Sequence, residues 1–366
     1  MHLCVDARMY CASGIGTYLQ NLLLPLSQSF DLTLIGDPGE IAATELPRIP
    51  TDIPIYSVAE LLRFPSLIPS CDIFWSPHYN VPVLPIRAKK RLVTIHDVFH
   101  LAYVHTLSLK QKLYAKLIMQ AAIRLSDGII TVSEFSKSEI QAYTGASTSK
   151  ISVIPNGVNH QQFHTDYTLA ETEQVSEKYH LPDKYILYVG NVKPHKNLSR
   201  LVEAYALIAE HLPHKLVIVG KKEGFITGDT SLHDRIQQNS VLQDKIIFTG
   251  FVADEDLPKI YAMASLFVFP SLYEGFGLPP LEAMASGCLT LTSQRASMPE
   301  ICGDATTYFH PEDTPDLAAK IKELLTIPTH TRQEIITAGV KKAVEYTWKA
   351  AAQQHVEVMK QLCLSN

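Results

Sequence analysis

The sequence predicts an α/β protein built from two doubly wound parallel sheets. Short apolar runs alternate with longer segments of helical period along the chain, which is the pattern of repeated β-α-β units. The alternation stops over residues 159–182, which are polar and contain no clear strand, and then resumes. At 366 residues the chain is also longer than one hydrophobic core usually serves. We therefore expect two domains.

The first half of the chain supplies the first sheet. It opens with a strand-like run at residues 3–7 and a helical pattern at 15–28. Further apolar runs predict strands at residues 31–36, 71–77, 91–97, 128–133 and 150–158, with a helix at 107–125 before the fourth of them. We expect residues 1–165 to form this N-terminal domain.

The second half repeats the pattern. Apolar runs predict strands at residues 185–190, 215–220, 245–250 and 266–271, and helical patterns follow at 314–326, 331–345 and 348–362. We expect residues 180–345 to form a C-terminal domain, with a separate terminal helix at 346–366.

Composition excludes several classes of protein. The 32 Lys and Arg against 37 Asp and Glu give a net charge of −5, so no overall positive field attracts a polyanion and we expect no nucleic-acid partner. The six cysteines show no CxxC spacing and are interpreted as reduced core thiols. The N-terminus does not resemble a signal peptide, and no apolar run reaches about 18 residues. These features predict a cytoplasmic protein.

The segment PSLYEGFGLPPLEAMASG (270–287) has the order of an anion-binding site: strand end, glycine loop, helix start. Gly275 and Gly277 let backbone N–H groups approach an anion closely, and a helix N-terminus favours negative charge. We expect a diphosphate to bind here.

Two acids flank this loop. Glu282 has two interpretations: an acid that complements the helix dipole, or a carboxylate that accepts the hydroxyls of a ribose. Glu274, at the open end of the loop, is placed to reach a sugar attached to the second phosphate.

The segment ASGIGTYLQNLL (12–23) has two interpretations as well. It partly matches a dinucleotide-binding fingerprint, but Leu19 stands where that pattern needs its third glycine, which argues against an NAD or FAD enzyme. Further along, His96 and Asp97 end a strand, where a histidine is either a ligand-binding residue or a satisfied core residue.

Two further patterns remain open. Asp254 and Asp256 form a D-x-D string, which is either a metal site or an acidic helix start, and we favour the helix start. We thus expect no metal and no cofactor. The helix at 107–125 carries basic residues among leucines and isoleucines, which indicates either a solvated face or contact with an anionic membrane or a lipid-linked acceptor. These basic residues are Lys110, Lys112, Lys116 and Arg124.

The spacing of Glu274 and Glu282, with seven residues between them, resembles the signature of retaining glycosyltransferases of family 4. That family has the GT-B fold, two Rossmann-like domains facing a central cleft. The resemblance extends over most of the chain, and residues 188–206 resemble the first strand and helix of the family's nucleotide-binding domain. Four further segments resemble the mannosyltransferase-like branch of the family: residues 94–105, 131–140, 153–159 and 296–305.

The resemblance implies roles for individual residues. Lys196 would contact the donor diphosphate, and His96 the donor sugar. Asn191 stands where the family often has an arginine, and Lys193 or Arg295 would compensate. The implied catalytic set is Glu274, Lys196 and His96; the implied donor-binding set is Gly14, Gly16, Asn191, Val252, Gly275, Phe276, Gly277, Leu278 and Glu282.

The resemblance also implies the reaction. The chain would move a hexose, best represented by mannose from GDP-mannose, from a nucleotide-diphospho-sugar to a glycan or lipid-linked acceptor in polysaccharide or lipopolysaccharide biosynthesis. Its terminal helix would cross back to the N-terminal domain, and that domain would touch the inner face of the membrane. The alternatives are a GT-B nucleotide-sugar epimerase and a catalytically silent nucleotide-sugar-binding protein, and products formed from donor alone identify the epimerase.

Overall fold

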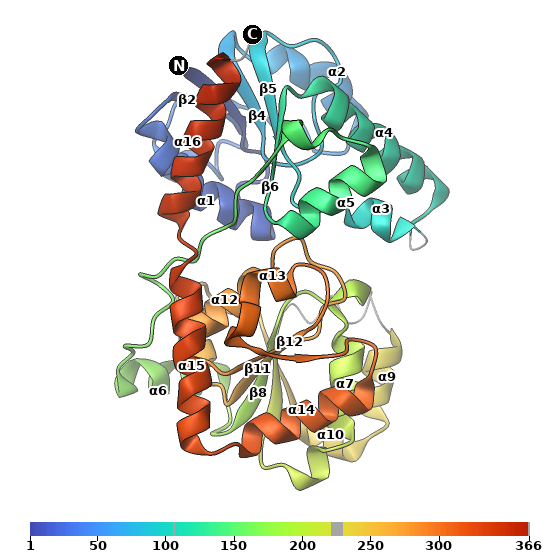
Figure 1. Cartoon of the computed structure of the whole chain (residues 1–366), viewed down its shortest axis with the longest axis vertical. Helices are drawn as coiled ribbons and strands as arrows, with labels where there is room; N and C mark the ends of the chain where they lie inside the picture. Colours follow the sequence, from blue (N-terminus) through green and yellow to red (C-terminus); the bar gives the residue numbers. More distant parts are fainter. Residues whose placement is uncertain (105–106, 221–229, 365–366) are drawn as a thin grey trace. The chain divides into compact units, whose positions relative to one another are not determined.

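The computed structural model describes residues 1–104, 107–220 and 230–364 (Figure 1). The chain folds into two compact units. Residues 1–157 and 348–366 form the first, and residues 158–347 form the second. The chain therefore leaves the first unit once and returns to it with its last helix.

The described part of the first unit contains a seven-stranded parallel sheet of order β3-β2-β1-β4-β5-β6-β7. Its strands are β1 (His2–Asp6), β2 (Asp31–Gly36), β3 (Arg48–Pro50), β4 (Cys71–Ser76), β5 (Ala88–Thr94), β6 (Gly128–Thr131) and β7 (Ile151–Val153). Its helices are α1 (Ser13–Ser27), α2 (Val58–Leu67), α3 (Phe99–Ala102), α4 (Leu109–Leu125), α5 (Glu134–Thr144) and α16 (Trp348–Leu364). The strand order reverses direction between β1 and β4, so this is the topological switch point of the sheet.

The described part of the second unit contains a six-stranded parallel sheet of order β10-β9-β8-β11-β12-β13. Its strands are β8 (Tyr185–Val189), β9 (Lys215–Val219), β10 (Ile246–Gly250), β11 (Leu266–Phe269), β12 (Thr290–Ser293) and β13 (Thr307–Phe309). Its α-helices are α6 (Leu169–Tyr179), α7 (Leu198–Ala206), α9 (Thr230–Gln237), α10 (Ser240–Lys245), α11 (Leu257–Met263), α12 (Leu278–Ala285), α13 (Met298–Cys302), α14 (Thr314–Thr326) and α15 (Thr329–Val344). Here the switch point lies between β8 and β11.

Both sheets are covered by helices, which explains why their strands are almost continuously apolar. In the second unit, Ile186, Leu216 and Val268 of the sheet pack with Leu201 of α7 and Leu317 of α14 in one buried cluster. This core holds the strand ends rigidly, and the loops that follow them can therefore position functional side chains.

A chain of hydrogen bonds fixes α16 to the first unit, where it packs against α1, β4 and β5 (Figure 1). The His355 ring donates from Nδ1 to the Ala351 carbonyl at 2.7 Å, so its Nε2 accepts from the Tyr18 hydroxyl at 2.5 Å. Thr94 then donates to Tyr18 at 3.1 Å and accepts from the Trp75 indole at 3.0 Å. Every polar group of this buried chain is satisfied.

The cysteine interpretation needs a correction. All six thiols are free, but only Cys4, Cys71, Cys288 and Cys302 are buried. Cys11 is exposed and Cys363 is half-buried, so those two are not core thiols. Of the helices that the structure describes, none has both the length and the apolar composition to cross a membrane.

Candidate functional site

In the second unit, the glycine loop connects the carboxyl end of β11 to the start of α12. Gly277 adopts φ +96°, and a Cβ built on it would lie 2.2 Å from the Met298 Cε atom. The positive φ favours glycine here, because an L side chain would strain the backbone, and the end of the Met298 side chain would also have to move. α12 begins at the next residue, Leu278, so the loop ends at a helix N-terminus. Pro279 and Pro280 have no N–H, so Leu278 is the one residue among the first three of this helix with a backbone donor.

Lys196 and Glu274 lie on either side of the switch point of this sheet. Lys196 follows β8 and Glu274 follows β11, and these strands are neighbours. The Lys196 Nζ atom lies 2.6 Å from Glu274 Oε1, and the two side chains are only 20% and 14% exposed. In open α/β sheets, ligands bind at the carboxyl ends of the strands beside the switch point. The pair therefore stands where a ligand is expected.

Two hydrogen bonds to backbone carbonyls join the loop after β8 to the loop after β11. The Leu272 amide donates to the His195 carbonyl at 2.7 Å, and the Asn197 side chain donates to the Pro270 carbonyl at 3.1 Å. The Lys196 ammonium also lies 5.7 Å from the centre of the Phe269 ring. The position of the ammonium is thus set by both loops.

Ser297 holds the glycine loop in place through two hydrogen bonds, a role that the sequence analysis did not identify. Its buried hydroxyl lies 2.9 Å from the Phe276 carbonyl and 3.0 Å from the Glu274 carbonyl. Phe276 is itself buried and packs against Tyr346, with ring centres 5.7 Å apart. Ser297 belongs to the segment 296–305 that marked the family resemblance, which was the available signal.

Glu282 is not the first-turn acid that one of its interpretations assumed. It is the fifth residue of α12, the first turn contains no acid, and its carboxylate accepts from the Tyr261 hydroxyl at 3.2 Å. Burial raises the pKa of Glu282 to about 7, although the Tyr261 hydrogen bond opposes the rise; Asp254 adds to it. A carboxylate that ionises near neutrality is a strong acceptor for hydroxyl groups.

The remaining residues expected to bind the donor in this unit lie in neighbouring loops. Asn191 is exposed in the loop after β8, and its carbonyl accepts from the Tyr188 hydroxyl at 3.1 Å. Val252 is buried just after β10. Of the two candidates to replace the family arginine, Lys193 is exposed in the Asn191 loop, whereas Arg295 pairs with Glu312 at 3.0 Å.

In the first unit, Gly14 and Gly16 lie within a helix and not in a loop before it, because α1 already begins at Ser13. A Cβ on Gly16 would lie 2.6 Å from the Tyr10 carbonyl oxygen, whereas a Cβ on Gly14 would meet nothing within 4 Å. Gly16 is therefore required by packing. Packing does not require a glycine at position 14, where the exposed backbone is accessible to a ligand.

His96 follows β5 in the same unit. Its Nε2 lies 3.0 Å from the Pro77 carbonyl and therefore carries the proton, which leaves Nδ1 as a hydrogen-bond acceptor. The Tyr18 ring packs edge-on against the imidazole at 4.9 Å. Burial lowers the pKa of His96, so the ring is neutral at pH 7.

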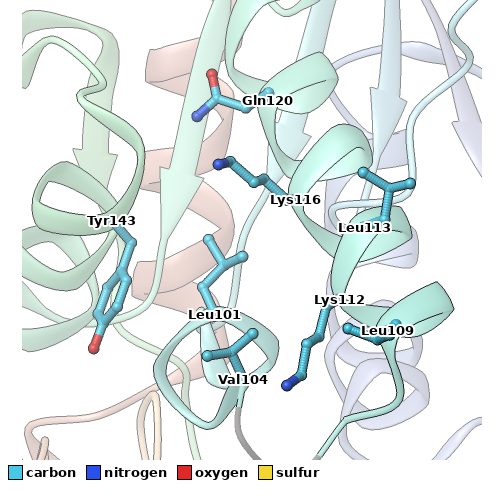
Figure 2. Close-up of a pocket in the computed structure, with 8 residues that line it drawn as sticks. All are labelled: Leu101, Val104, Leu109, Lys112, Leu113, Lys116, Gln120 and Tyr143. Atoms are coloured by element: carbon cyan, nitrogen blue, oxygen red, sulfur yellow. The ribbon is translucent and has the colours of Figure 1, made fainter.

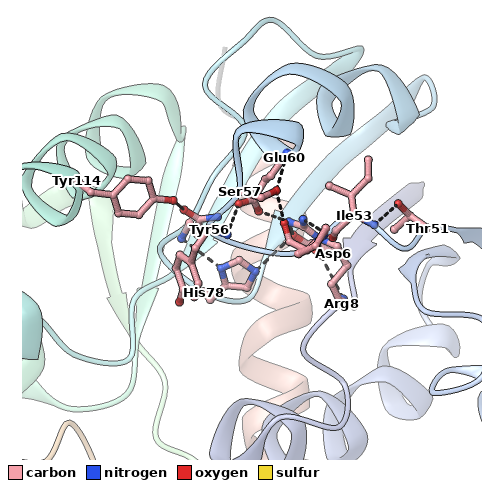
Figure 3. Close-up of polar contacts among 11 residues, drawn as sticks. Asp6, Arg8, Thr51, Ile53, Tyr56, Ser57, Glu60, His78 and Tyr114 are labelled. Carbon is pink, nitrogen blue, oxygen red and sulfur yellow. Dashed lines mark hydrogen bonds and ion pairs between the residues drawn. The ribbon is translucent and has the colours of Figure 1, made fainter. Parts of the chain in front are cut away.

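A buried charged cluster occupies the switch point of the first sheet (Figure 3). Asp6 ends β1, and its carboxylate accepts from the Arg8 guanidinium at 2.7 and 2.8 Å. Arg8 also pairs with Glu60 at 2.5 Å, and His78 Nε2 lies 3.4 Å from Asp6. Burial opposes ionisation of Asp6, but the Arg8 charge holds the pKa of that carboxyl well below its usual range. The sequence analysis missed this cluster, although Asp6 and His78 both follow apolar runs.

The D-x-D string stands directly before a helix, as expected, and Asp256 also has a second role. Asp256 precedes α11 without capping it, and its carboxylate accepts from Lys178 Nζ at 2.7 Å and from the Tyr179 hydroxyl at 2.9 Å. Asp256 therefore ties α6 to α11. Over the described ranges, no three or more His, Cys, Asp or Glu side chains come together in a group that could hold a metal ion.

Two family models match successive parts of the chain. Residues 12–162 match the model for glycosyltransferase family 4, and residues 171–342 match the model for glycosyl transferases group 1. An O-antigen chain mannosyltransferase B of Escherichia coli is 30% identical over 292 residues, which cover 79% of this chain and 74% of that protein. The chain belongs to glycosyltransferase family 4. The expected family and its mannosyltransferase-like branch are confirmed.

Further comparisons with this family 4 chain bear on its fold and its length. HepE of Anabaena, whose structure was solved in complex with UDP-glucose, superimposes with a TM-score of 0.79 at 17% identity and covers 99% of this chain and 100% of its own. This confirms the expected GT-B class, α/β with two Rossmann-like units. The serotype-specific mannosyltransferase WbdA of Escherichia coli is 30% identical over 246 residues, or 67% of this chain, and the match spans 30% of WbdA.

The expected site residues of this family 4 glycosyltransferase fall into two sets. Lys196 and Glu274 are joined directly in the second unit, and the loop 275–278, Glu282, Asn191 and Val252 belong to the same unit. Gly14, Gly16 and His96 belong to the first unit. Each set lies at or beside the carboxyl ends of its own sheet.

Proposed function

We propose that this chain is a retaining, metal-independent glycosyltransferase that moves a mannosyl residue from GDP-mannose to a glycan or lipid-linked acceptor in polysaccharide or lipopolysaccharide biosynthesis. The observation that carries the proposal is the half-buried Lys196–Glu274 pair beside the glycine loop at the switch point of the second sheet. The second unit, within residues 180–345, would hold the donor. The first unit would bind the acceptor. It would comprise a domain within residues 1–165 and the terminal helix at 346–366.

The reaction builds negative charge on the departing nucleoside diphosphate. In the proposed donor complex, Lys196 exchanges part of its contact with Glu274 for a phosphate oxygen, and the amides of the glycine loop and of Leu278 meet the remaining charge. A fixed cation and fixed amides of this kind stabilise the leaving group without a metal or another cofactor. No such group is needed in this mechanism.

In the proposed reaction, the new bond forms on the same face of the sugar as the bond that breaks. The acceptor oxygen bonds to the anomeric carbon as the bond from that carbon to the diphosphate oxygen breaks, and the acceptor proton passes to the leaving phosphate. Glu274 would contact the sugar, and Glu282 would accept the ribose hydroxyls. His96 would use Nδ1 to accept a hydrogen bond from a hydroxyl of the transferred sugar.

The choice of mannose rests on the mannosyltransferases among the relatives. The choice of acceptor class rests on the O-antigen chain mannosyltransferase among them. Six free thiols suit a reducing compartment, so we assign the reaction to the cytoplasmic side of a membrane, with peripheral contact through the first unit.

A two-stage experiment tests this function. Nucleotide sugars are first screened by thermal shift, where a ligand at 100 times its dissociation constant adds about 2.7 kcal/mol to stability. GDP-mannose should give the largest shift. The donor is then incubated alone and with a lipid extract, and the products are analysed. Labelled glycan or lipid supports transfer; an epimerised nucleotide sugar from donor alone, or binding without any product, contradicts it.

A further inference from the structure

The outer face of α4, in the first unit, exposes three leucines in a row. Leu109, Leu113 and Leu117 follow one another at four-residue spacing and are 83%, 61% and 59% exposed. The opposite face of the helix, with Ala115, Met119 and Ala122 among others, is buried. α4 is therefore anchored without its outer leucines, which contribute little to folding.

The leucine row borders a groove of about 440 Å³ between α3, α4 and α5 (Figure 2). Leu101 and Val104 form its wall on the α3 side, and Tyr143 of α5 forms another. Val104 and Tyr143 are 40% and 46% exposed, so the apolar surface continues beyond α4. We call the exposed side chains of α4 together with this groove the α4 surface.

The α4 surface is cationic as well as apolar. Residues 98–126 contain four Lys or Arg and no Asp or Glu, in a chain whose net charge is −5. These are Lys110, Lys112, Lys116 and Arg124. Within the described residues, none of the four forms an ion pair. Lys112 and Lys116 form the row next to the leucines and line the groove with them (Figure 2).

We infer that the α4 surface binds a phospholipid bilayer rich in anionic head groups. Leucines that enter the boundary between head groups and acyl chains lose their contact with water, and lysines beside them stay at the level of the phosphates. The inference rests on the proposed function, because it names the surface by which the enzyme would reach a lipid-linked acceptor. A second copy of this chain is disfavoured as occupant, because two copies would bring their unpaired lysines together.

Vesicle flotation tests the inference on the full chain. The vesicles contain phosphatidylethanolamine with about one third phosphatidylglycerol, or phosphatidylcholine alone. The wild type should float with the first and at least tenfold less with the second. Lys112→Gln/Lys116→Gln should weaken binding to the anionic vesicles by about 25-fold, since each lysine near an anionic surface contributes about fivefold. Leu113→Ser/Leu117→Ser should weaken it at least tenfold.

Leu24→Ser on α1 is the matched control, since Leu24 is 66% exposed in the same unit and outside the α4 surface. It should float like the wild type. Equal binding to both vesicle types, no binding to either, or variants that float as the wild type does would overturn the inference. So would leucine variants that convert a wild-type dimer to a monomer in light scattering.

A thermal-shift measurement on the same variants distinguishes failure of the proposed catalytic function from failure of membrane binding. GDP-mannose should raise the melting temperature equally in the wild type and in all the surface variants, because these side chains do not belong to the donor site. If GDP-mannose has no effect on the melting temperature of any of these proteins while flotation gives the expected results, the proposed function is wrong and the inference that the α4 surface binds a membrane is supported.

Discussion

The Lys196 ammonium lies 2.6 Å from the Glu274 carboxylate and joins two loops that are 78 residues apart in the sequence. Neighbouring parallel strands, β8 and β11, bring these loops together at the switch point of the sheet. The pair neutralises the lysine charge in the free protein. In the proposed donor complex, a diphosphate would replace part of this ion pair, so we expect the two side chains to act as one unit.

The first prediction follows from this coupling. Lys196→Ala and Glu274→Ala should each lower kcat by about a hundredfold or more, the scale of losing one preorganised charge-stabilising contact. The double variant should lose far less than the product of the two losses, because each single change already removes the pair. Steady-state kinetics with GDP-mannose measures all four proteins.

The matched control is Lys320→Ala in α14, whose ion pair with Glu323 lies on the surface of the same unit. It should retain wild-type kcat, since exposed pairs contribute about 0 to 1 kcal/mol. Near wild-type activity in Lys196→Ala would remove the diphosphate assignment.

The strand periodicity of the sequence predicted much of the fold, and short or interrupted elements account for what it missed. The strand at 31–36 and the helix at 314–326 agree with β2 and α14. The strand expected at 150–158 shrinks to Ile151–Val153, because Pro155 cannot donate to a ladder. β3, β12 and β13 are short and contain only one or two hydrophobic residues each, so they form no apolar run that marks a strand.

Candidate site residues could be proposed one by one where local chemistry marks them, as with Glu274 and the two glycines of the loop 274–277. Their partners were not, because they come from distant segments. Tyr261 meets Glu282 only through the packing of α11 on α12, and His78 meets Asp6 only through the pairing of β1 with β4. Such pairs depend on tertiary structure, which a single sequence does not encode locally.

The second prediction concerns Glu282 and pH. Its pKa of about 7 in the folded protein lies above the ordinary glutamate value of 4.5, so the native state holds a proton that the unfolded state has lost between those pH values. This contribution to stability falls as pH rises through that window. Glu282→Gln cannot lose a proton and should melt at a higher temperature than the wild type at pH 8. At pH 4.5 this proton-linked advantage should be absent. Thermal unfolding at both pH values measures the difference.

The same carboxylate must be ionised to accept two hydroxyls. The wild-type KM for the donor should therefore rise as pH falls below about 7, and Glu282→Gln should raise KM at pH 8 with a smaller effect on kcat. A variant with the wild-type KM and the wild-type pH profile would assign Glu282 to structure alone.

The third prediction tests His96 as a specificity residue. Its Nδ1 is expected to accept a hydrogen bond from the 6-hydroxyl of the donor sugar. A buried polar group left without a hydrogen-bond partner costs about 1 to 3 kcal/mol. The kcat/KM for a 6-deoxy donor such as GDP-rhamnose should therefore be about 5- to 150-fold lower than that for GDP-mannose. His96→Ala should erase most of this preference. If the ratio of kcat/KM for the two donors is unchanged in the variant, His96 is a structural histidine.

The fourth prediction separates metal chemistry from structure at Asp256. Transfer should persist in excess EDTA, because Lys196 and the loop amides meet the charge. Asp256→Asn should keep its activity and lose about 1 to 2 kcal/mol of stability, since its carboxylate holds Lys178 and Tyr179. Activity abolished by EDTA, restored by Mn²⁺ and lost in Asp256→Asn would reverse this assignment.

The fifth prediction concerns the buried chain that fixes α16. Burial lowers the pKa of His355 to about 4. An unfolded histidine titrates near about 6.5, so the unfolded state gains a proton first as pH falls. Stability should drop between pH 6.5 and 4, by about 3 kcal/mol in all at about 1.4 kcal/mol per pKa unit.

His355→Met should lose this dependence, and it should be less stable at pH 7 by about 1 to 3 kcal/mol because the Tyr18 hydroxyl loses its acceptor. Urea unfolding at pH 7 and pH 5 measures both effects. Parallel pH profiles for variant and wild type would show that His355 does not titrate as expected.

Transfer of labelled mannose from GDP-mannose to a bacterial lipid extract, with the wild type and Lys196→Ala assayed side by side, decides whether the second unit is the donor site of a mannosyltransferase. We expect the wild type to form labelled lipid or glycan with one GDP released per mannose transferred, and Lys196→Ala to form it about a hundredfold more slowly. Labelled product formed equally fast by both proteins, or none formed by a wild type that binds GDP-mannose, would contradict this.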